Sequence, residues 1–139
     1  MHIAIVDDLE SDRRSLGDLL ERYFESVGMN LAMDVYESGE AFLQRTTDSE
    51  YDLVFLDIFM KELTGMEVAR RIAADGSRCP VIFLTTSMDY ALEGYEVGAF
   101  RYLLKPVDQA KLEQTLSVFM DRFQKEERKL PLMVDRTRV

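Results

Sequence analysis

Residues 51–60, YDLVFLDIFM, form an apolar, β-prone run that carries an aspartate, Asp57, where the run is about to end. Tyr, Val, Ile and Phe favour strands, so the run predicts a strand over residues 52–56. An aspartate is out of place in an apolar strand unless its position serves a purpose. The position of Asp57 at the carboxyl end of this strand raises the question of which residues stand at the ends of the other strands.

Four other β-prone runs flank this one, and segments of helical period separate them. The predicted strands cover residues 2–6, 31–36, 52–56, 81–84 and 100–103. The predicted helices carry apolar residues at helical spacing over residues 16–27, 41–43, 66–72 and 90–97, and from about residue 108 onward. Strands that alternate with helices indicate βαβ units. The sequence therefore predicts an α/β fold with a doubly wound, five-stranded parallel sheet and helices on both faces.

The length and charge of the chain restrict its class. Its 139 residues, 47% of them hydrophobic, suffice for one compact domain. With 26 acidic and 17 basic side chains the formal charge is −9, which argues against DNA binding by this chain alone. A cation or a basic partner fits this charge better.

Other features of the composition favour a cytoplasmic protein without disulfides. The single cysteine, Cys79, stands before Pro80 at the start of an apolar run, which favours a buried structural thiol. No signal peptide is recognisable at the first residues, and no stretch approaches the length of a membrane-spanning helix.

Polar residues stand at the ends of four predicted strands. The residues are Asp7 and Asp8 after the first strand, Asp57 after the third, Thr85 at the fourth and Lys105 after the fifth. Taken singly, an aspartate after a strand is usually a helix cap or turn former, and a lysine before proline a solvated loop charge. Parallel strands, however, bring their carboxyl ends to one edge of the sheet, where ligand sites form. Clustered carboxylates are costly without a counter-ion, so a positive group is expected among them.

Phosphoryl transfer onto a carboxylate suits this set of side chains. A hard divalent cation such as Mg²⁺ takes oxygen ligands, and Asp7 and Asp8 would hold it. Asp57 would supply a further ligand oxygen and the nucleophile. Lys105 would balance the charge of the phosphoryl group, and the Thr85 hydroxyl would donate a hydrogen bond to it.

The chain resembles the receiver domains of two-component response regulators over about residues 2–124. The resemblance lies in the segments IAIVDD, YDLVFLDIFM with Gly65 downstream, VIFLTTS and FRYLLKPV, in this order. It implies a flavodoxin-like sheet with strand order 2-1-3-4-5 and a phosphoryl group received from a sensor histidine kinase. The segment YALEGYEVGAFRYLLKPVD is most similar to receivers that precede a LytTR-type DNA-binding domain.

The resemblance also implies a role for each matching residue. Asp57 would be the phospho-acceptor, Asp8 the direct ligand of Mg²⁺ or Mn²⁺, and Asp7 its acidic neighbour. The backbone carbonyl of Phe59 would complete the metal site. Thr85 would be the switch hydroxyl, Lys105 the active-site lysine and Tyr102 the switch aromatic, which turns into space that Thr85 vacates on phosphorylation.

Two departures from the family pattern stand beside the acceptor and switch positions. Lys61 replaces a proline that many receivers carry, which leaves that loop less rigid. Thr86 stands where alanine or glycine is frequent, so the phosphoryl pocket is expected to be more crowded.

Two alternative functions remain open at this point. A phosphatase of the haloacid dehalogenase type also forms an aspartyl phosphate, but it typically carries a second aspartate where this chain has Phe59. A phosphorylation-independent interaction module on the same scaffold would be favoured by loss of Asp8, Asp57 or Lys105, and all three are present.

The domain division expected from the sequence is a receiver over residues 1–124 and a linker over residues 125–139. The linker would include the first strand of a missing output domain, which would bind DNA. A disordered or loosely docked tail is the rival interpretation. Phosphorylation is expected to promote a homodimer through the fourth helix, fifth strand and fifth helix, without any membrane association.

Overall fold

The computed structural model describes the backbone of residues 1–45 and 51–138 and the side chains of residues 1–45 and 51–126. By its internal contacts the chain divides into two compact units, Met1–Val107 and Asp108–Val139. The predicted site residues all lie in the first unit.

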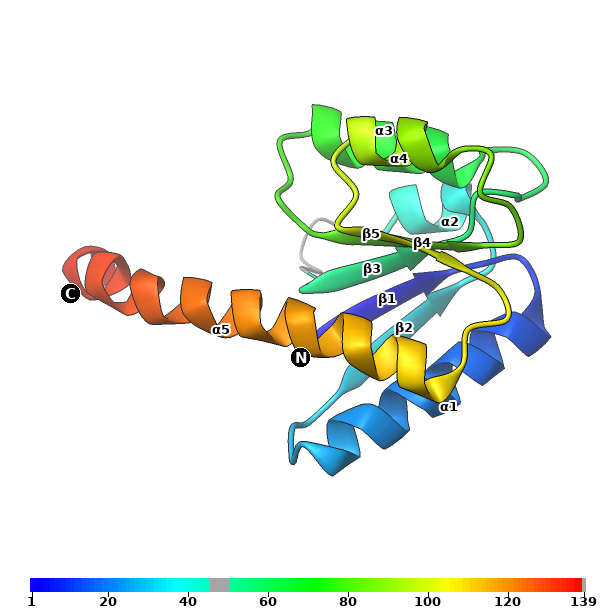
Figure 1. Ribbon diagram of the computed structural model, residues 1–139. Helices are drawn as coiled ribbons and strands as arrows, with labels where there is room; N and C mark the ends of the chain where they lie inside the picture. Colours follow the sequence, from blue (N-terminus) through cyan, green and yellow to red (C-terminus); the bar gives the residue numbers. More distant parts are fainter. Residues whose placement is uncertain (46–50, 139) are drawn as a thin grey trace. The chain divides into compact units, whose positions relative to one another are not determined.

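The first unit contains one five-stranded parallel sheet (Figure 1). Its strands are β1 (His2–Val6), β2 (Ala32–Tyr36), β3 (Leu53–Leu56), β4 (Val81–Thr85) and β5 (Arg101–Leu104). The strand order β2-β1-β3-β4-β5 confirms the order that the family resemblance implied. The chain leaves β1 toward β2 on one side and then returns to β3 on the other, so the strand order reverses between β1 and β3. In such sheets the ligand site lies at this switch point.

Helices cover both faces of this sheet, as the sequence predicted. α1 (Glu10–Ser26) lies on one face, and α2 (Gly39–Leu43), α3 (Gly65–Ala74) and α4 (Ala91–Glu96) lie on the other (Figure 1). A parallel sheet covered in this way has strands that are apolar on both sides. All four residues of β3 and all five of β4 are accordingly buried.

The core on the α3 side is built from alternate strand residues, because successive side chains of a strand point to opposite faces. Strands β1, β3 and β4 contribute Ala4, Val6, Val54, Leu56, Val81 and Phe83, and helices α2 and α3 contribute Phe42, Met66, Val68, Ala69 and Ile72. Burial of each large apolar side chain stabilises the fold by about 1.5–3 kcal/mol. The sheet is therefore a rigid base for the loops at its carboxyl edge.

The single cysteine lies at the amino end of β4. Cys79 is only partly buried, and its Sγ atom donates a hydrogen bond to the backbone carbonyl of Tyr51 at 3.1 Å. Burial raises the pKa of the Cys79 thiol to about 12. The thiol is thus protonated near neutral pH, which agrees with the structural role predicted for it.

The second unit contains one helix, α5 (Gln109–Arg138). Its start agrees with the prediction, and Asp108 caps it by accepting a hydrogen bond from the Lys111 backbone N–H at 2.7 Å. The strand expected within residues 125–139 was wrong for this chain, because α5 is helical through Arg138. Residues 124–129, QKEERK, are strong helix formers, and an isolated strand is unstable without a partner strand. The assignment of residues 125–139 to a linker stays a prediction.

No helix among the described residues combines the length and the apolar character that crossing a membrane requires.

Hydrogen bonds at the start of α3 fix the loop that follows β3. Thr64 caps the helix in a capping box, because its Oγ1 atom accepts from the Glu67 backbone N–H and the Glu67 carboxylate accepts from the Thr64 backbone N–H. The next residue, Gly65, donates its N–H to the carbonyl of Ile58 at 3.0 Å. A Cβ atom on Gly65 would lie 2.0 Å from the backbone carbonyl oxygen of Asp57. Only glycine allows this approach.

Gly65→Ala should therefore lower the free energy of unfolding by about 2–3 kcal/mol, since the added methyl group meets backbone that cannot move freely. Urea denaturation followed by circular dichroism measures this change. Gly17→Ala in α1 is the matched control, because its Cβ atom would meet nothing closer than Met33 Cε at 3.8 Å. That variant should gain about 0.5–1 kcal/mol from its helix position. Equal stability of Gly65→Ala and the wild type would contradict the close approach.

Candidate functional site

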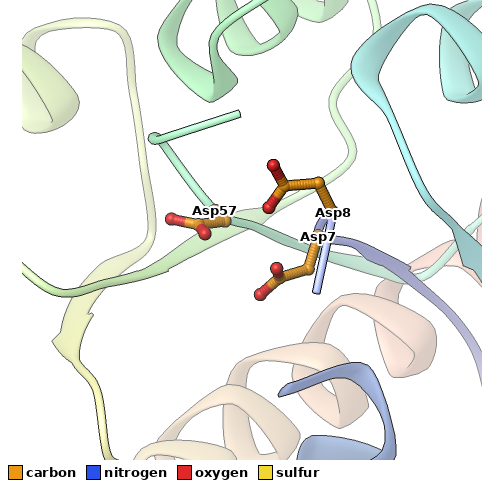
Figure 2. A group of neighbouring side chains, drawn as sticks. All are labelled: Asp7, Asp8 and Asp57. Atoms are coloured by element: carbon orange, nitrogen blue, oxygen red, sulfur yellow. The ribbon is translucent and has the colours of Figure 1, made fainter. Parts of the chain in front are cut away.

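Three carboxylates meet at the carboxyl ends of β1 and β3. Asp7 and Asp8 follow β1, and Asp57 follows β3 (Figure 2). One carboxylate oxygen of each lies within 4.8 Å of those of the other two. Asp7 and Asp57 are buried, with side chains 8% and 7% exposed, whereas Asp8 is partly exposed. The sheet thus brings Asp57 to Asp7 and Asp8, which lie about 50 positions earlier in the sequence.

Backbone hydrogen bonds fix two of these carboxylates. The N–H of Asp57 donates to the carbonyl of Val6 at 3.0 Å, so the pairing of β3 with β1 extends to the acceptor position. The Oδ1 atom of Asp57 accepts from the N–H of Phe59 at 3.2 Å. The Oδ1 atom of Asp7 likewise accepts from the N–H of Leu9 at 3.0 Å. Each carboxylate therefore keeps its second oxygen, Oδ2, for another partner.

That partner is Lys105, which follows β5. Its Nζ atom lies 2.7 Å from Asp7 Oδ2 and 3.0 Å from Asp57 Oδ2. The lysine side chain is only 10% exposed. The structure thereby supplies the positive group that the sequence analysis expected among the carboxylates.

A fourth carboxylate, Asp12, also contacts this lysine, and the sequence analysis missed it. Asp12 lies in the first turn of α1, and its Oδ2 atom is 2.7 Å from Lys105 Nζ. The only signal in the sequence was an aspartate five residues after Asp7 in a segment rich in charged residues. Such a position is usually solvated, so nothing short of the fold identifies it.

The pKa values of the site reflect burial and ion pairing. Burial raises the pKa of Asp7, and the hydrogen bonds from Lys105 and Leu9 only partly oppose this effect. Burial acts on Lys105 in the opposite sense, lowering its pKa, but the hydrogen bonds to Asp12, Asp7 and Asp57 together outweigh burial and raise it. Lys105 is thus firmly protonated at neutral pH.

The predicted switch residues lie on β4 and β5. Thr85 ends β4, is fully buried, and has no hydrogen-bond partner for its Oγ1 atom within the described part of the chain. Tyr102 on β5 is 6% exposed, and its hydroxyl donates to the carbonyl of Ser87 at 2.5 Å. Burial raises the pKa of this tyrosine. Tyr102 is thus buried in this structure, and its movement on phosphorylation stays a prediction.

Phe59 lies two residues after Asp57, with its side chain 44% exposed. Its ring packs edge-on against the ring of Tyr90, with 5.6 Å between the ring centroids. The ring of Tyr90 therefore packs on a residue that lies two positions after Asp57.

The donor set of this pocket fits a hard divalent cation. Asp7, Asp8 and Asp57 offer carboxylate oxygens, which are the ligands that Mg²⁺ and Mn²⁺ prefer. The partial exposure of Asp8 leaves room for the waters that Mg²⁺ retains. With Asp12, four carboxylates face the single charge of Lys105, so the pocket has an excess of negative charge.

Comparison with known proteins agrees with this geometry. Residues 3–117 match the family model described as the response regulator receiver domain. The chain is similar to the sensory transduction protein LytT of Bacillus subtilis (strain 168), with 32% identity over 119 residues that cover 86% of this chain and 48% of LytT. It thus spans about half the length of the curated relatives that it matches.

Two solved structures are similar in fold. The response regulatory domain of mrkE from Klebsiella pneumoniae has a TM-score of 0.80 at 23% identity, covering 90% of this chain and 99% of that one. The response regulator TrrA of Thermotoga maritima, in complex with Mg(2+)-BeF, has a TM-score of 0.73 at 28% identity, covering 85% of this chain and 97% of that one.

Proposed function

The chain belongs to the family of response regulator receiver domains, and on this premise we propose that Asp57 accepts a phosphoryl group from a sensor histidine kinase in a Mg²⁺-dependent reaction. The observation that carries the proposal is the cluster of Asp7, Asp8 and Asp57, two of whose carboxylates, Asp7 and Asp57, pair with Lys105. Receiver domains act as phosphorylation switches rather than as conventional enzymes.

The chemistry follows from the positions of the side chains. An oxygen of Asp57 attacks phosphorus, the bond to the donor histidine breaks, and an acyl phosphate forms. Mg²⁺ or Mn²⁺, held by Asp7, Asp8, Asp57 and the Phe59 carbonyl, would supply positive charge that offsets the phosphoryl oxygens. Lys105 would give up its contact with the Asp57 carboxylate and pair with a phosphoryl oxygen instead.

The switch depends on the buried hydroxyl of Thr85. A buried hydroxyl without a hydrogen-bond partner is unfavourable. An acceptor near Thr85 Oγ1 would therefore form a hydrogen bond that stabilises the arrangement containing it. The phosphoryl oxygens on Asp57 are such an acceptor. A Thr85 drawn toward them would hold Tyr102 in its buried position, where its hydroxyl bonds the Ser87 carbonyl. Phosphorylation would thus stabilise one arrangement of β4, β5 and the loop before α4.

The output of the switch belongs to a longer protein. The relative LytT is about twice as long as the matched region, which supports a receiver followed by an output domain. We place that domain after the linker at residues 125–139, as a LytTR-type DNA-binding module in a cytoplasmic transcription regulator. The net charge of −9 makes DNA binding by the receiver itself unfavourable.

Asp57→Asn should abolish phosphate incorporation while keeping the fold, because it removes the nucleophile and preserves the side-chain volume. Incubation with Mg²⁺ and a small phosphodonor, followed by intact-protein mass spectrometry, measures the stoichiometry. Asp75→Asn, at an exposed position that ends α3, is the control and should be labelled like the wild type. Labelling of Asp57→Asn at the wild-type level would assign the acceptor elsewhere.

Phe59→Asn should shorten the half-life of the acyl phosphate by about an order of magnitude, because a polar side chain can orient the attacking water. The exposed Phe59 ring, packed on Tyr90, cannot hydrogen-bond that water and excludes it. Loss of the phosphorylated mass over time after removal of the donor gives the rate. Phe59→Leu keeps the site apolar and should decay like the wild type. Equal decay of Phe59→Asn and Phe59→Leu would refute the role of the ring.

Phosphorylation should also promote a homodimer through the surface of α4 and β5. Leu92 and Tyr95 of α4 and Leu104 of β5 are exposed, with 76%, 49% and 45% exposure. α4 packs against β5, and exposed apolar residues on neighbouring elements are typical of an interface. Sedimentation velocity with and without beryllofluoride should show a monomer that becomes a dimer.

The matched variants for the dimer are Leu92→Glu, which should stay monomeric, and Val27→Glu, which alters a residue 50% exposed beyond the end of α1 and should dimerise. A wild-type chain that stays monomeric with beryllofluoride would count against receiver-driven dimerisation.

A further inference from the structure

Asp12 forms an ion pair with the buried Lys105, and the proposed reaction gives Asp12 no role. It is placed by the first turn of α1, and it approaches Lys105 Nζ as closely as Asp7 does, at 2.7 Å. Its side chain is 34% exposed, against 8% for Asp7 and 7% for Asp57. Asp12 therefore lies at the rim of the pocket, whereas the other two partners of the lysine lie inside it.

Without a metal, the hydrogen bonds of Lys105 are complete. An ammonium group has three N–H donors, and three carboxylates lie within hydrogen-bond distance of Nζ. Two of these three acceptors, Asp7 and Asp57, belong to the cluster suited to a cation. Among the described residues, Asp12 is the one partner of the lysine that lies outside this cluster.

Cation binding changes this balance. A divalent cation draws the oxygens of Asp7 and Asp57 toward itself, and its charge repels the nearby ammonium. A buried charge that loses its partners is strongly destabilised, so Lys105 needs to keep an acceptor that the cation does not draw away. Asp12 offers that acceptor without any change of helix or strand.

We propose that Asp12 is a positioning residue that holds Lys105 at the rim of the pocket while the cation occupies the carboxylates, and so sets the cation affinity. The proposal rests on the proposed function in that the pocket takes Mg²⁺. Asp12 contacts neither the cation nor the phosphoryl group and acts through Lys105. At the rim the lysine stays within reach of an incoming phosphoryl group.

The location of Asp12 supports this role. Asp12 lies in the first turn of α1, where the partial positive charge of the helix end favours a carboxylate. The same turn is tied to the site, because the Arg13 side chain donates a hydrogen bond to the Asp7 carbonyl at 2.8 Å. Because Lys105 Nζ already contacts Asp12 together with Asp7 and Asp57, it can keep Asp12 as a partner when the cation draws the other two carboxylates away.

Calorimetric titration of Mg²⁺ into the 139-residue chain tests the proposal. Asp12→Asn should weaken Mg²⁺ binding by about tenfold, as loss of a partner that orients a metal site does. Asp12→Glu should restore most of the affinity. Glu10→Gln is the matched control, because Glu10 lies in the same helical turn and pairs only on the surface, with Arg14. It should change the affinity by less than about twofold.

A double-mutant cycle separates the role of Asp12 from a plain effect of its charge. In the Lys105→Met background, Asp12→Asn should weaken Mg²⁺ binding by no more than about threefold, since the lysine that it positions is gone. The melting temperature without Mg²⁺ should change little in Asp12→Asn, since Lys105 keeps Asp7 and Asp57 as partners. A purely structural ion pair would lower that temperature.

The results distinguish this inference from the proposed function. An equal loss of affinity with and without Lys105, or a loss no larger than in Glu10→Gln, would overturn the role of Asp12. If the wild type binds Mg²⁺ and is phosphorylated on Asp57 in those cases, the proposed function stands. A wild-type chain that binds no Mg²⁺ would overturn both.

Discussion

The constraint on which the site depends is the balance of charge around one buried ammonium. Asp7, Asp12 and Asp57 each lie within 3.0 Å of Lys105 Nζ. Burial disfavours the charged forms of both Asp7 and Lys105, because it raises the pKa of the carboxyl group and acts to lower that of the lysine. Carboxylates this close together repel one another unless a cation stands between them. The lysine is that cation in the metal-free protein, and the remaining negative charge favours a second one. A pocket balanced in this way responds strongly to any group that brings or removes charge.

The parallel sheet makes this concentration of charge sterically possible. Its strand order reverses between β1 and β3, and aspartate follows each of these strands at the same edge. The pairing that continues from Val6 to the Asp57 N–H fixes the backbone of Asp57, and the close contact of Gly65 with the Asp57 carbonyl fixes the loop that follows. Core packing on both faces of the sheet thus stabilises a loop cluster that would be unstable by itself. The packing that stabilises the sheet therefore also positions the residues at the strand ends that form the site.

The way in which this site could transmit a signal follows from its unequal hydrogen bonding. The carboxylates and Lys105 have partners, whereas the Thr85 hydroxyl is buried without one among the described residues. A phosphoryl group on Asp57 would bring acceptor oxygens toward the Thr85 hydroxyl. Tyr102, bonded to the Ser87 carbonyl, joins β5 to the loop before α4. Receiver domains are switch domains, and in this chain Thr85 and Tyr102 lie on the adjacent strands β4 and β5.

The sequence by itself determined the sheet, the helices on both faces, and the placement of Asp7, Asp8, Asp57 and Lys105 at one edge. Apolar periodicity and strand ends are local signals, so they can be read without coordinates. Three features needed the tertiary structure. Asp12 is an ordinary helix residue until β5 brings Lys105 to it, and the burial of Tyr102 depends on its neighbours in the fold. Residues 125–138 continue α5 because a strand is stable only beside a partner, whereas a helix satisfies its own backbone hydrogen bonds. Contacts between distant residues are set by packing, which no local pattern encodes.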